Sequence, residues 1–261
     1  MSLRRTVVVA AVALTAAAGC ARDTTPADAT GVEHLRVEVV ATHPHDPTAF
    51  TEGLEVADGE LFEGTGLSGQ SYLSARDLAT GVERTRVPVP DGMFGEGVTV
   101  AGDTVWQWTW QDGVALARDR VTLAERSRAR FDGEGWGLCA QPDRLVASDG
   151  SDRLTFRDPV TFQPRGSVAV TLDGKPQDNL NELECASDGR VYANVWRTPY
   201  IVRIDPADGR ITGVVDASGL LTAAESRNAD VLNGIAQVPG TDRFLITGKY
   251  YPKLFEVRFV S

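Results

Sequence analysis

A short phrase made of an acid or an amide, usually a glycine, and then an apolar residue recurs along the chain. It occurs at Glu52-Gly53-Leu54, Glu96-Gly97-Val98, Glu134-Gly135-Trp136, Asn181-Glu182-Leu183 and Asn233-Gly234-Ile235. Carboxylates accept and return protons, and amides can hold a developing negative charge, so these side chains suit acid–base chemistry if the fold brings them together. Acids on inner strands more often bond to neighbouring backbone, and for any single glutamate that structural role is the commoner case.

One lysine is a candidate partner for these acids. The chain has 26 basic residues, and only three of them are lysines: Lys175, Lys249 and Lys253. Where arginine is the usual cation, a lysine at the end of a strand offers a compact, titratable head. The alternative is a solvated surface lysine, and composition alone favours that alternative.

The recurring phrase also predicts the fold. Its copies stand roughly 40 to 50 residues apart, a period typical of solenoids and propellers. Each copy is followed by a turn and a second apolar run, as at Asp58-Gly59, and in the first four units an Asp-centred turn comes later, as at Arg76-Asp77. Strands of about five residues between such turns indicate an all-β chain. Five units of this kind predict a five-bladed β-propeller, with the phrases on the innermost strands around one channel.

A further strand is expected before the first phrase. Residues 34–42 alternate apolar and polar side chains, and residues 254–260 form another strand at the end of the last unit. We predict that the N-terminal strand joins the last blade and closes the ring, which removes exposed sheet edges. In the second blade, Trp106 and Trp108 are expected in the core, whereas Trp110 is expected to reach an open surface.

The first residues are expected to be a targeting signal. Arg4 and Arg5 precede an apolar run that is too short to span a bilayer, and Gly19-Cys20 follows it. We interpret residues 1–19 as a lipoprotein-type signal peptide, 20–33 as a flexible tether lipidated at Cys20, and 34–261 as the propeller. The alternative is an ordinary signal peptide with an incidental cysteine. The predicted location is the outer face of a bacterial membrane, reached only through the lipid anchor.

Charge and cysteine usage restrict the partners. The formal net charge is −10, and removal of the segment with Arg4 and Arg5 makes it more negative, which argues against nucleic acid and anionic membrane surfaces. Two cysteines remain after export, Cys139 and Cys185, each shortly after the start of its phrase. Such a pair at matched depth on neighbouring strands predicts a disulfide, and two buried free thiols are the alternative.

The sequence carries no zinc-site motif. The three histidines, His34, His43 and His45, lie near the N-terminus, and neither HExxH nor Cys-x-x-Cys is present. No catalytic cofactor is therefore expected. A structural calcium ion in the channel stays open, because carboxylates and asparagines ligate calcium.

Seven short segments stand out between about His45 and Phe259: 50–54 (FTEGL), 63–67 (EGTGL), 94–97 (FGEG), 180–184 (LNELE), 193–196 (ANVW), 232–236 (LNGIA) and 247–249 (TGK). In their order and spacing they resemble the glutamine cyclotransferases of the plant and bacterial type. The resemblance implies a five-bladed propeller, unrelated to the zinc-dependent animal enzymes. It also implies an activity on peptides or proteins with an N-terminal glutamine, which becomes pyroglutamate with release of ammonia.

The resemblance makes Glu96 the proton-transfer carboxylate, with Asn181 and Lys249 as its partners across the channel. One carboxylate suffices, because it can take the proton of the attacking α-amine, whose pKa is about 8, and then return it to the leaving nitrogen. Lys249, Asn181 and indole N–H groups are expected to hold the developing oxyanion.

The resemblance also implies the substrate-binding residues. The aromatic walls are Trp110, Trp136 and Trp196, and the floor is Phe50, Glu52 and Gln70. Two positions depart from the family pattern: Glu52 stands where glutamine is frequent, and Tyr251 stands where tryptophan is frequent.

Two other classes of function stay open beside this one. A binding-only propeller lipoprotein would have no reason to keep an acid, an amide and a lysine together at the channel. A calcium-dependent lactonase or sugar-oxidising propeller would need a fuller set of carboxylates around its metal. We expect the protein to be a monomer.

Overall fold

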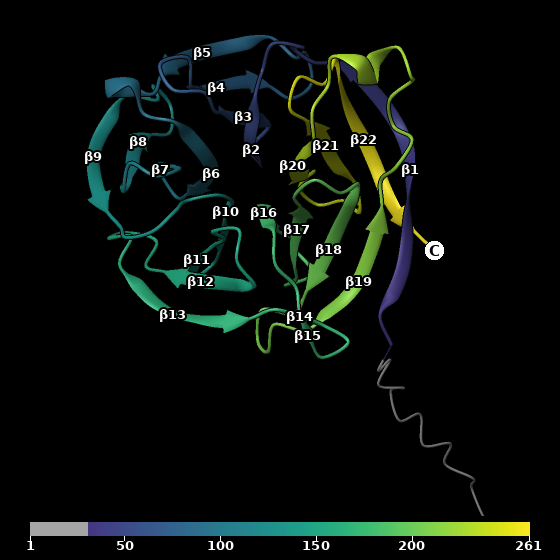
Figure 1. The fold of residues 1–261 in the computed structure, drawn as a ribbon. Coiled ribbons are helices and arrows are strands. Elements are labelled where there is room, and N and C mark those ends of the chain that lie inside the picture. Colours follow the sequence, from purple (N-terminus) through teal and green to yellow (C-terminus); the bar gives the residue numbers. More distant parts are fainter. Residues whose placement is uncertain (1–30) are drawn as a thin grey trace, which may run out of the picture. The chain divides into compact units, whose positions relative to one another are not determined.

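The structure, a computed structural model, describes residues 31–261, and nearly all regular structure in them is β (Figure 1). The two helical segments are single 3-10 turns, η1 (Pro90–Gly92) and η2 (Glu225–Arg227). The all-β prediction is confirmed. None of the helical segments in residues 31–261 is long and apolar enough to cross a bilayer. The predicted signal peptide, most of the tether and Cys20 lie outside the described residues.

Three four-stranded antiparallel sheets follow one another along the chain, each built from consecutive strands. The first contains β2 (Thr51–Ala57), β3 (Glu60–Thr65), β4 (Tyr72–Asp77) and β5 (Glu83–Pro88). The second contains β6 (Gly95–Ala101), β7 (Thr104–Thr109), β8 (Val114–Asp119) and β9 (Glu125–Arg130). The third contains β10 (Leu138–Gln141), β11 (Arg144–Ala147), β12 (Arg153–Arg157) and β13 (Pro164–Ala169). A small hairpin of β14 (Thr171–Leu172) and β15 (Lys175–Pro176) follows.

The remaining strands form one eight-stranded sheet in the order β16-β17-β18-β19-β1-β22-β21-β20. Its strands are β1 (Glu33–Pro44), β16 (Leu180–Cys185), β17 (Val191–Val195), β18 (Tyr200–Ile204), β19 (Ile211–Asp216), β20 (Leu232–Gln237), β21 (Phe244–Gly248) and β22 (Lys253–Val260). β1 pairs antiparallel with β22, as expected for the N-terminal strand. It also pairs in parallel with β19, which the alternation of residues 34–42 did not predict. β1 therefore joins two runs of consecutive strands into one sheet.

The innermost strands carry the recurring phrases. Figure 1 places β2, β6, β10, β16 and β20 toward the centre of the sheets, and each contacts the next, with β20 contacting β2. Apolar clusters fill the spaces between neighbouring sheets: Leu54 and Leu61 pack with Leu245, and Trp106 and Trp108 are buried in the cluster that contains Phe162. The outer strands β5 and β9 are mostly exposed and rich in arginine and glutamate, a composition that protects sheet edges from pairing.

A disulfide joins two of the inner strands. Cys139 on β10 is bonded to Cys185 at the end of β16, which confirms the predicted pair. The bond links the third sheet to the eight-stranded sheet across their shared apolar cluster. These two strands also lie next to Trp136 and carry Asn181, so the bond braces one side of the candidate site.

Candidate active site

A buried ion pair joins β2 to the eight-stranded sheet. Lys249, directly after β21, donates from Nζ to Oε1 of Glu52 on β2 at 2.6 Å, and their side chains are only 8% and 2% exposed. Oε2 of the same carboxylate accepts a hydrogen bond of 3.1 Å from Nδ2 of Asn233 on β20. Three strands thus fix the Glu52 carboxylate. The surface role that composition favoured for Lys249 is wrong, because the lysine is desolvated and paired.

Glu96, on β6, supplies a second carboxyl group at the same place. The carboxyl groups of Glu96 and Glu52 lie within hydrogen-bonding reach of each other. Oε2 of Glu96 is buried and meets no N–H or hydroxyl donor among the described residues. Glu96 therefore has a buried oxygen without a protein donor, and its carboxyl group lies beside a second one with which it can share a proton.

Both carboxyl groups hold protons more tightly than an exposed glutamate does. Burial raises the pKa of Glu52 to about 7, although the Lys249 ammonium opposes the shift. Burial and then the neighbouring Glu52 carboxylate raise the pKa of Glu96 well above its ordinary value. Two like-charged groups this close titrate as a pair, which favours one shared proton near neutral pH.

The two asparagines of the recurring phrase differ in their partners. Asn233 is fully buried and donates to the backbone oxygen of Thr51 at 3.0 Å as well as to Glu52. Asn181, on β16, is also buried, yet its Oδ1 has no hydrogen-bond partner in residues 31–261. Within the same residues, Asn181 makes no hydrogen bond to Glu96 or Lys249. Its amide is placed on an inner strand but is not committed to a contact.

Aromatic rings form an arc beside the ion pair. The Phe50 ring lies 4.3 Å from Nζ of Lys249 and packs edge-on against Tyr250 and Phe94, with centroid distances of 5.2 and 6.1 Å. Phe94 in turn contacts Trp110 at 5.6 Å, and Trp110 is 37% exposed. A cation beside a ring face and a run of edge-to-face rings are both favourable arrangements. The arc brings Phe50 and Trp110 together, as predicted, and adds Phe94 and Tyr250.

Glu134 continues this wall with hydrogen bonds. Its Oε2 accepts the indole N–H of Trp110 at 2.8 Å and that of Trp136 at 2.9 Å, and its Oε1 accepts the amide of Gln111 at 2.7 Å. Partial burial works against its charged form, but these three hydrogen bonds outweigh burial and hold the pKa of Glu134 below its usual value. Trp136 then packs edge-on against Trp196 at 5.5 Å. Two of the indoles expected to hold an oxyanion are therefore already bonded to Glu134.

Glycines allow these rings to approach the backbone. A Cβ at Gly66 would lie 2.4 Å from Cε1 of Phe94 and 3.0 Å from Oε1 of Glu52. At Gly150, where φ is +79°, a Cβ would lie 2.7 Å from the Trp136 ring. A side chain at either position would displace a site residue.

Two residues singled out by the sequence do not join the cluster. Gln70 is exposed in the turn after β3, and no described contact links it to the carboxyl pair. Tyr251 is half-buried, with its ring against Gly248 and its carbonyl oxygen bonded to His45. The Tyr251 ring therefore packs within its own turn.

Glu182, within the fourth phrase, is a structural acid. Its two oxygens accept hydrogen bonds from the backbone N–H groups of Leu54 on β2 at 3.2 Å and Ile235 on β20 at 2.7 Å.

Within residues 31–261, no group of three or more His, Cys, Asp or Glu side chains is arranged to hold a metal ion.

Comparison with known proteins gives matches along the whole sheet region. The family model described as glutamine cyclotransferase matches residues 8–259. A glutaminyl-peptide cyclotransferase from Arabidopsis thaliana is 37% identical over 227 residues, which are 85% of this chain and 71% of the relative. The crystal structure of a Myxococcus xanthus glutaminyl cyclase has a TM-score of 0.79 and 38% identity, and the match covers 88% of this chain and 99% of that chain. The residues matched by the family model include Glu52, Glu96 and Lys249.

Proposed function

The chain belongs to the glutamine cyclotransferase family and has the activity of a glutaminyl-peptide cyclotransferase, and from that premise we propose that Glu96 performs the proton transfers. The substrate class is a peptide or protein with an N-terminal glutamine. Its α-amine attacks its own Cδ, the new C–N bond closes the ring, and the side-chain nitrogen leaves as ammonia. The observation that carries the assignment of Glu96 is its buried, donor-free Oε2 beside the Glu52–Lys249 pair.

The division of labour between the two carboxyl groups follows from their partners. Lys249 and Asn233 both donate to Glu52, so this carboxylate is committed to holding the lysine. Glu96 has no such donor in the described chain and keeps its oxygen for a substrate proton. The substrate reacts as its free α-amine, which attacks Cδ. Glu96 takes a proton from this nitrogen as the new C–N bond forms and passes the same proton to the departing amide nitrogen, so that neutral ammonia leaves and Glu96 is ready again.

The tetrahedral intermediate carries negative charge on the former amide oxygen. Lys249 and Asn181 are the donors we assign to that oxygen, since the two Trp indoles of the wall are bonded to Glu134. Lys249 can serve both Glu52 and the oxyanion because an ammonium has three N–H groups.

Positioning supplies much of the remaining rate. The reaction is intramolecular, so the site must fold the glutamine side chain back until its Cδ meets the amine. The arc of Phe50, Phe94 and Trp110 and the Trp136–Trp196 pair give apolar faces for this folded side chain. Rings that exclude water also keep Lys249 and Asn181 from being solvated.

A product assay tests this function directly. Purified protein is incubated with a Gln-initiated dipeptide, and ammonia is measured by a coupled assay while mass spectrometry follows formation of the pyroglutamyl product. We expect turnover with and without a metal chelator, because the nucleophile and the proton carrier need no metal. Loss of turnover with chelator would contradict the metal-free mechanism, and absence of the pyroglutamyl product would contradict the function.

We also propose that residues 34–261 are a five-bladed propeller. The proposal treats β16–β19 as one blade and β20–β22 with β1 as another, so that β1 closes the ring against β22. Its support is the cyclic contact of β2, β6, β10, β16 and β20 and the apolar cluster between each pair of neighbouring groups. An experimental structure at side-chain resolution decides the blade count.

The location and assembly are proposals from sequence. Gly19-Cys20 after the apolar run supports lipidation of Cys20 and anchoring on the outer face of a membrane. Labelling with a radioactive fatty acid, in the wild type and in Cys20→Ser, tests the anchor. We propose a monomer without a catalytic cofactor, and light scattering of the purified domain measures the mass.

A further inference from the structure

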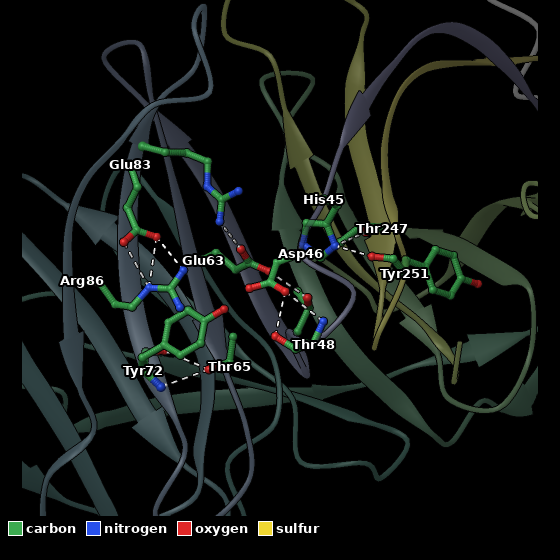
Figure 2. Close-up of polar contacts among 12 residues, drawn as sticks. His45, Asp46, Thr48, Glu63, Thr65, Tyr72, Glu83, Arg86, Thr247 and Tyr251 are labelled. Atoms are coloured by element: carbon green, nitrogen blue, oxygen red, sulfur yellow. Dashed lines mark hydrogen bonds and ion pairs between the residues drawn. The ribbon is translucent and has the colours of Figure 1, made fainter. Parts of the chain in front are cut away.

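A second charged cluster lies beside the active-site floor, at the seam where β1 leads into β2. His45 is buried in this cluster, with its ring between the carboxylate of Glu63 and the backbone oxygen of Tyr251 (Figure 2). The distances are 2.8 Å from Nε2 to Oε1 of Glu63 and 2.7 Å from Nδ1 to the Tyr251 oxygen. The proposed mechanism uses none of these three residues.

The hydrogen-bond partners fix the protonation of His45. A carbonyl oxygen can only accept, so Nδ1 must carry a proton. Glu63 also accepts hydrogen bonds from the Thr51 hydroxyl at 2.8 Å and from Arg76 at 2.6 Å, so this carboxylate is ionised and only accepts as well. Nε2 must then carry a proton too. His45 is therefore an imidazolium with both N–H groups engaged.

The charges around the ring agree with this state. Burial lowers the pKa of His45, but the hydrogen bond and charge of Glu63 outweigh burial, and the pKa is raised overall. Of the other elements against the ring, β4 brings the Arg76 cation, which opposes the shift, and β21 brings the uncharged Thr247, 3.5 Å from Nδ1. On its own segment, Asp46 is the adjacent charged group.

The same cluster touches both parts of the chain that carry site residues. Tyr251 belongs to the turn after β21, two residues beyond Lys249, and Tyr250 N donates to Ala49 O at 2.8 Å. On the β2 side, the Thr51 hydroxyl bound by Glu63 lies between Phe50 and Glu52 in sequence. Asp230 and Val231 bond the backbone of Lys249, and the segment at His45 bonds the turn that follows Lys249.

We propose that His45 is a positioning residue for the reaction. Its imidazolium bridges the Tyr251 carbonyl and the Glu63 carboxylate. This bridge keeps the turn after Lys249 in place, so that Lys249 stays paired with Glu52. The inference rests on the proposed role of Lys249. His45 thus acts on catalysis through Lys249, and this action requires the imidazolium form, in which both ring nitrogens are donors.

Two neutral variants separate the two bonds of the ring. His45→Asn places an amide donor near the position of Nδ1, where it can still reach the Tyr251 carbonyl. His45→Gln places its donor near the position of Nε2, toward Glu63, and leaves the carbonyl without a partner. Both variants lose the imidazolium charge, so we expect similar losses of thermal stability. A misplaced Lys249 lowers kcat by about 10- to 100-fold in His45→Gln, and His45→Asn recovers most of this loss.

Two further readouts do not depend on turnover. Lys249 is nearly buried and the exposed Lys175 serves as reference, so mass spectrometry after treatment with an amine-reactive reagent reports how well Lys249 is held. We expect faster labelling of Lys249 in His45→Gln than in the wild type or His45→Asn. Nitrogen-15 NMR of the ligand-free wild type should show both His45 ring nitrogens protonated at pH 7.

These measurements distinguish the outcomes. A neutral His45 ring at pH 7 would overturn the imidazolium. If both variants, measured well below their unfolding temperatures, keep wild-type kcat and wild-type Lys249 labelling, His45 only stabilises the fold and the proposal fails. A wild type that releases no ammonia overturns the proposed function, while ring protonation and Lys249 labelling still decide whether His45 holds the turn. In an active enzyme, kcat of the wild type should fall as His45 deprotonates at high pH, because a neutral ring keeps its one N–H for the Glu63 carboxylate and loses the bond to the Tyr251 carbonyl. His45→Asn should lack that decline.

Discussion

Two buried glutamates on neighbouring sheets use their oxygens in opposite ways. Glu63, on β3, accepts hydrogen bonds from His45, Thr51 and Arg76, so both of its oxygens have donors. Glu96, on β6, has a buried oxygen that meets no donor in the part of the chain that the structure describes. The pKa of Glu63 is lowered although burial opposes this, because His45 and Arg76 outweigh burial, whereas burial and the Glu52 charge raise the pKa of Glu96.

This contrast shows which of the two buried acids is available for chemistry. A buried polar atom without a partner costs about 1 to 3 kcal/mol, so a fold keeps one only where something else requires it. The fully bonded carboxylate is committed to holding the seam between β1 and β2. The incompletely bonded carboxyl group can still exchange a proton with a substrate. Substitutions at the two clusters should therefore separate turnover from stability.

The largest effect is expected on turnover at Glu96. Glu96→Gln keeps the shape but removes the proton carrier, and we expect the rate of ammonia release to fall by about 10²- to 10⁴-fold. Stability should stay equal or rise, because a buried carboxyl group beside Glu52 is removed. The coupled ammonia assay and thermal unfolding measure the two quantities, with the exposed Glu83→Gln as matched control. A folded Glu96→Gln enzyme with normal turnover would remove Glu96 from its role.

The next largest effect is expected on stability at Glu63. Glu63→Gln leaves the buried His45 and the partly buried Arg76 without their counter-ion, so we expect the free energy of unfolding to fall by about 3 to 5 kcal/mol. Urea unfolding at pH 7 measures the change. The double variant Glu63→Gln with His45→Gln should lose less than the sum of the two single variants, because the two groups share one interaction.

The pH dependence of this difference has a defined sign. The pKa of Glu63 is lowered on folding, so its stabilisation is present above its unfolded pKa and is lost as the pH falls through its folded pKa. The pKa of His45 is raised, so its stabilisation is complete below its unfolded pKa, near 6.5, and is lost as the pH rises through its folded pKa. The difference in the free energy of unfolding between wild type and Glu63→Gln should therefore be largest between the unfolded pKa of Glu63 and the unfolded pKa of His45. A gap that does not change with pH would contradict the ionised pair.

A smaller effect is expected on the pH profile from a substitution at Glu52. Glu52→Gln restores the residue frequent in the family and removes the like charge that raises the pKa of Glu96. The substitution also frees the Lys249 ammonium from its ion pair with residue 52, and this positive charge lowers the pKa of Glu96 further. The acidic limb of the kcat/KM profile should move to lower pH by about one unit or more. A profile that stays in place would show that Glu52 and Glu96 do not share a proton.

The smallest effect is expected at a histidine only two residues from His45. His43 lies 3.6 Å from Glu256, but its side chain is 49% exposed, so water and salt screen the pair. His43→Gln should change the free energy of unfolding by less than about 1 kcal/mol and leave kcat unchanged. A loss as large as that of Glu63→Gln would mean that burial is not what separates the two pairs.

The parts of the site that repeat along the chain could be predicted from the sequence. Glu52 and Glu96 occupy equivalent positions of the recurring phrase, and this period places both on inner strands. The likeness of 247–249 to the family placed Lys249 beside them. Residue types at a fixed period carry this information without knowledge of side-chain geometry.

The parts that depend on contacts between loops could not be predicted. The hydrogen bond between His45 and Tyr251 joins residues 206 positions apart in the sequence, and nothing near either residue signals the other. Glu134 was recognised as a member of the phrase, but the choice of Trp110 and Trp136 as its partners depends on how two sheets approach each other. Gln70 was expected at the floor, yet the turn after β3 leaves it exposed.

The placement of β1 has a consequence for the order in which the chain folds. β1 is synthesised before every other strand of the sheets, yet both of its neighbours, β19 and β22, come from the last fifth of the chain. It must stay unpaired until nearly all of the polypeptide exists, so its docking is a late and slow step dominated by distant contacts. Since Arg36 lies opposite Val260, a circularly permuted gene could append this strand after Ser261 and turn the slowest pairing into a local hairpin.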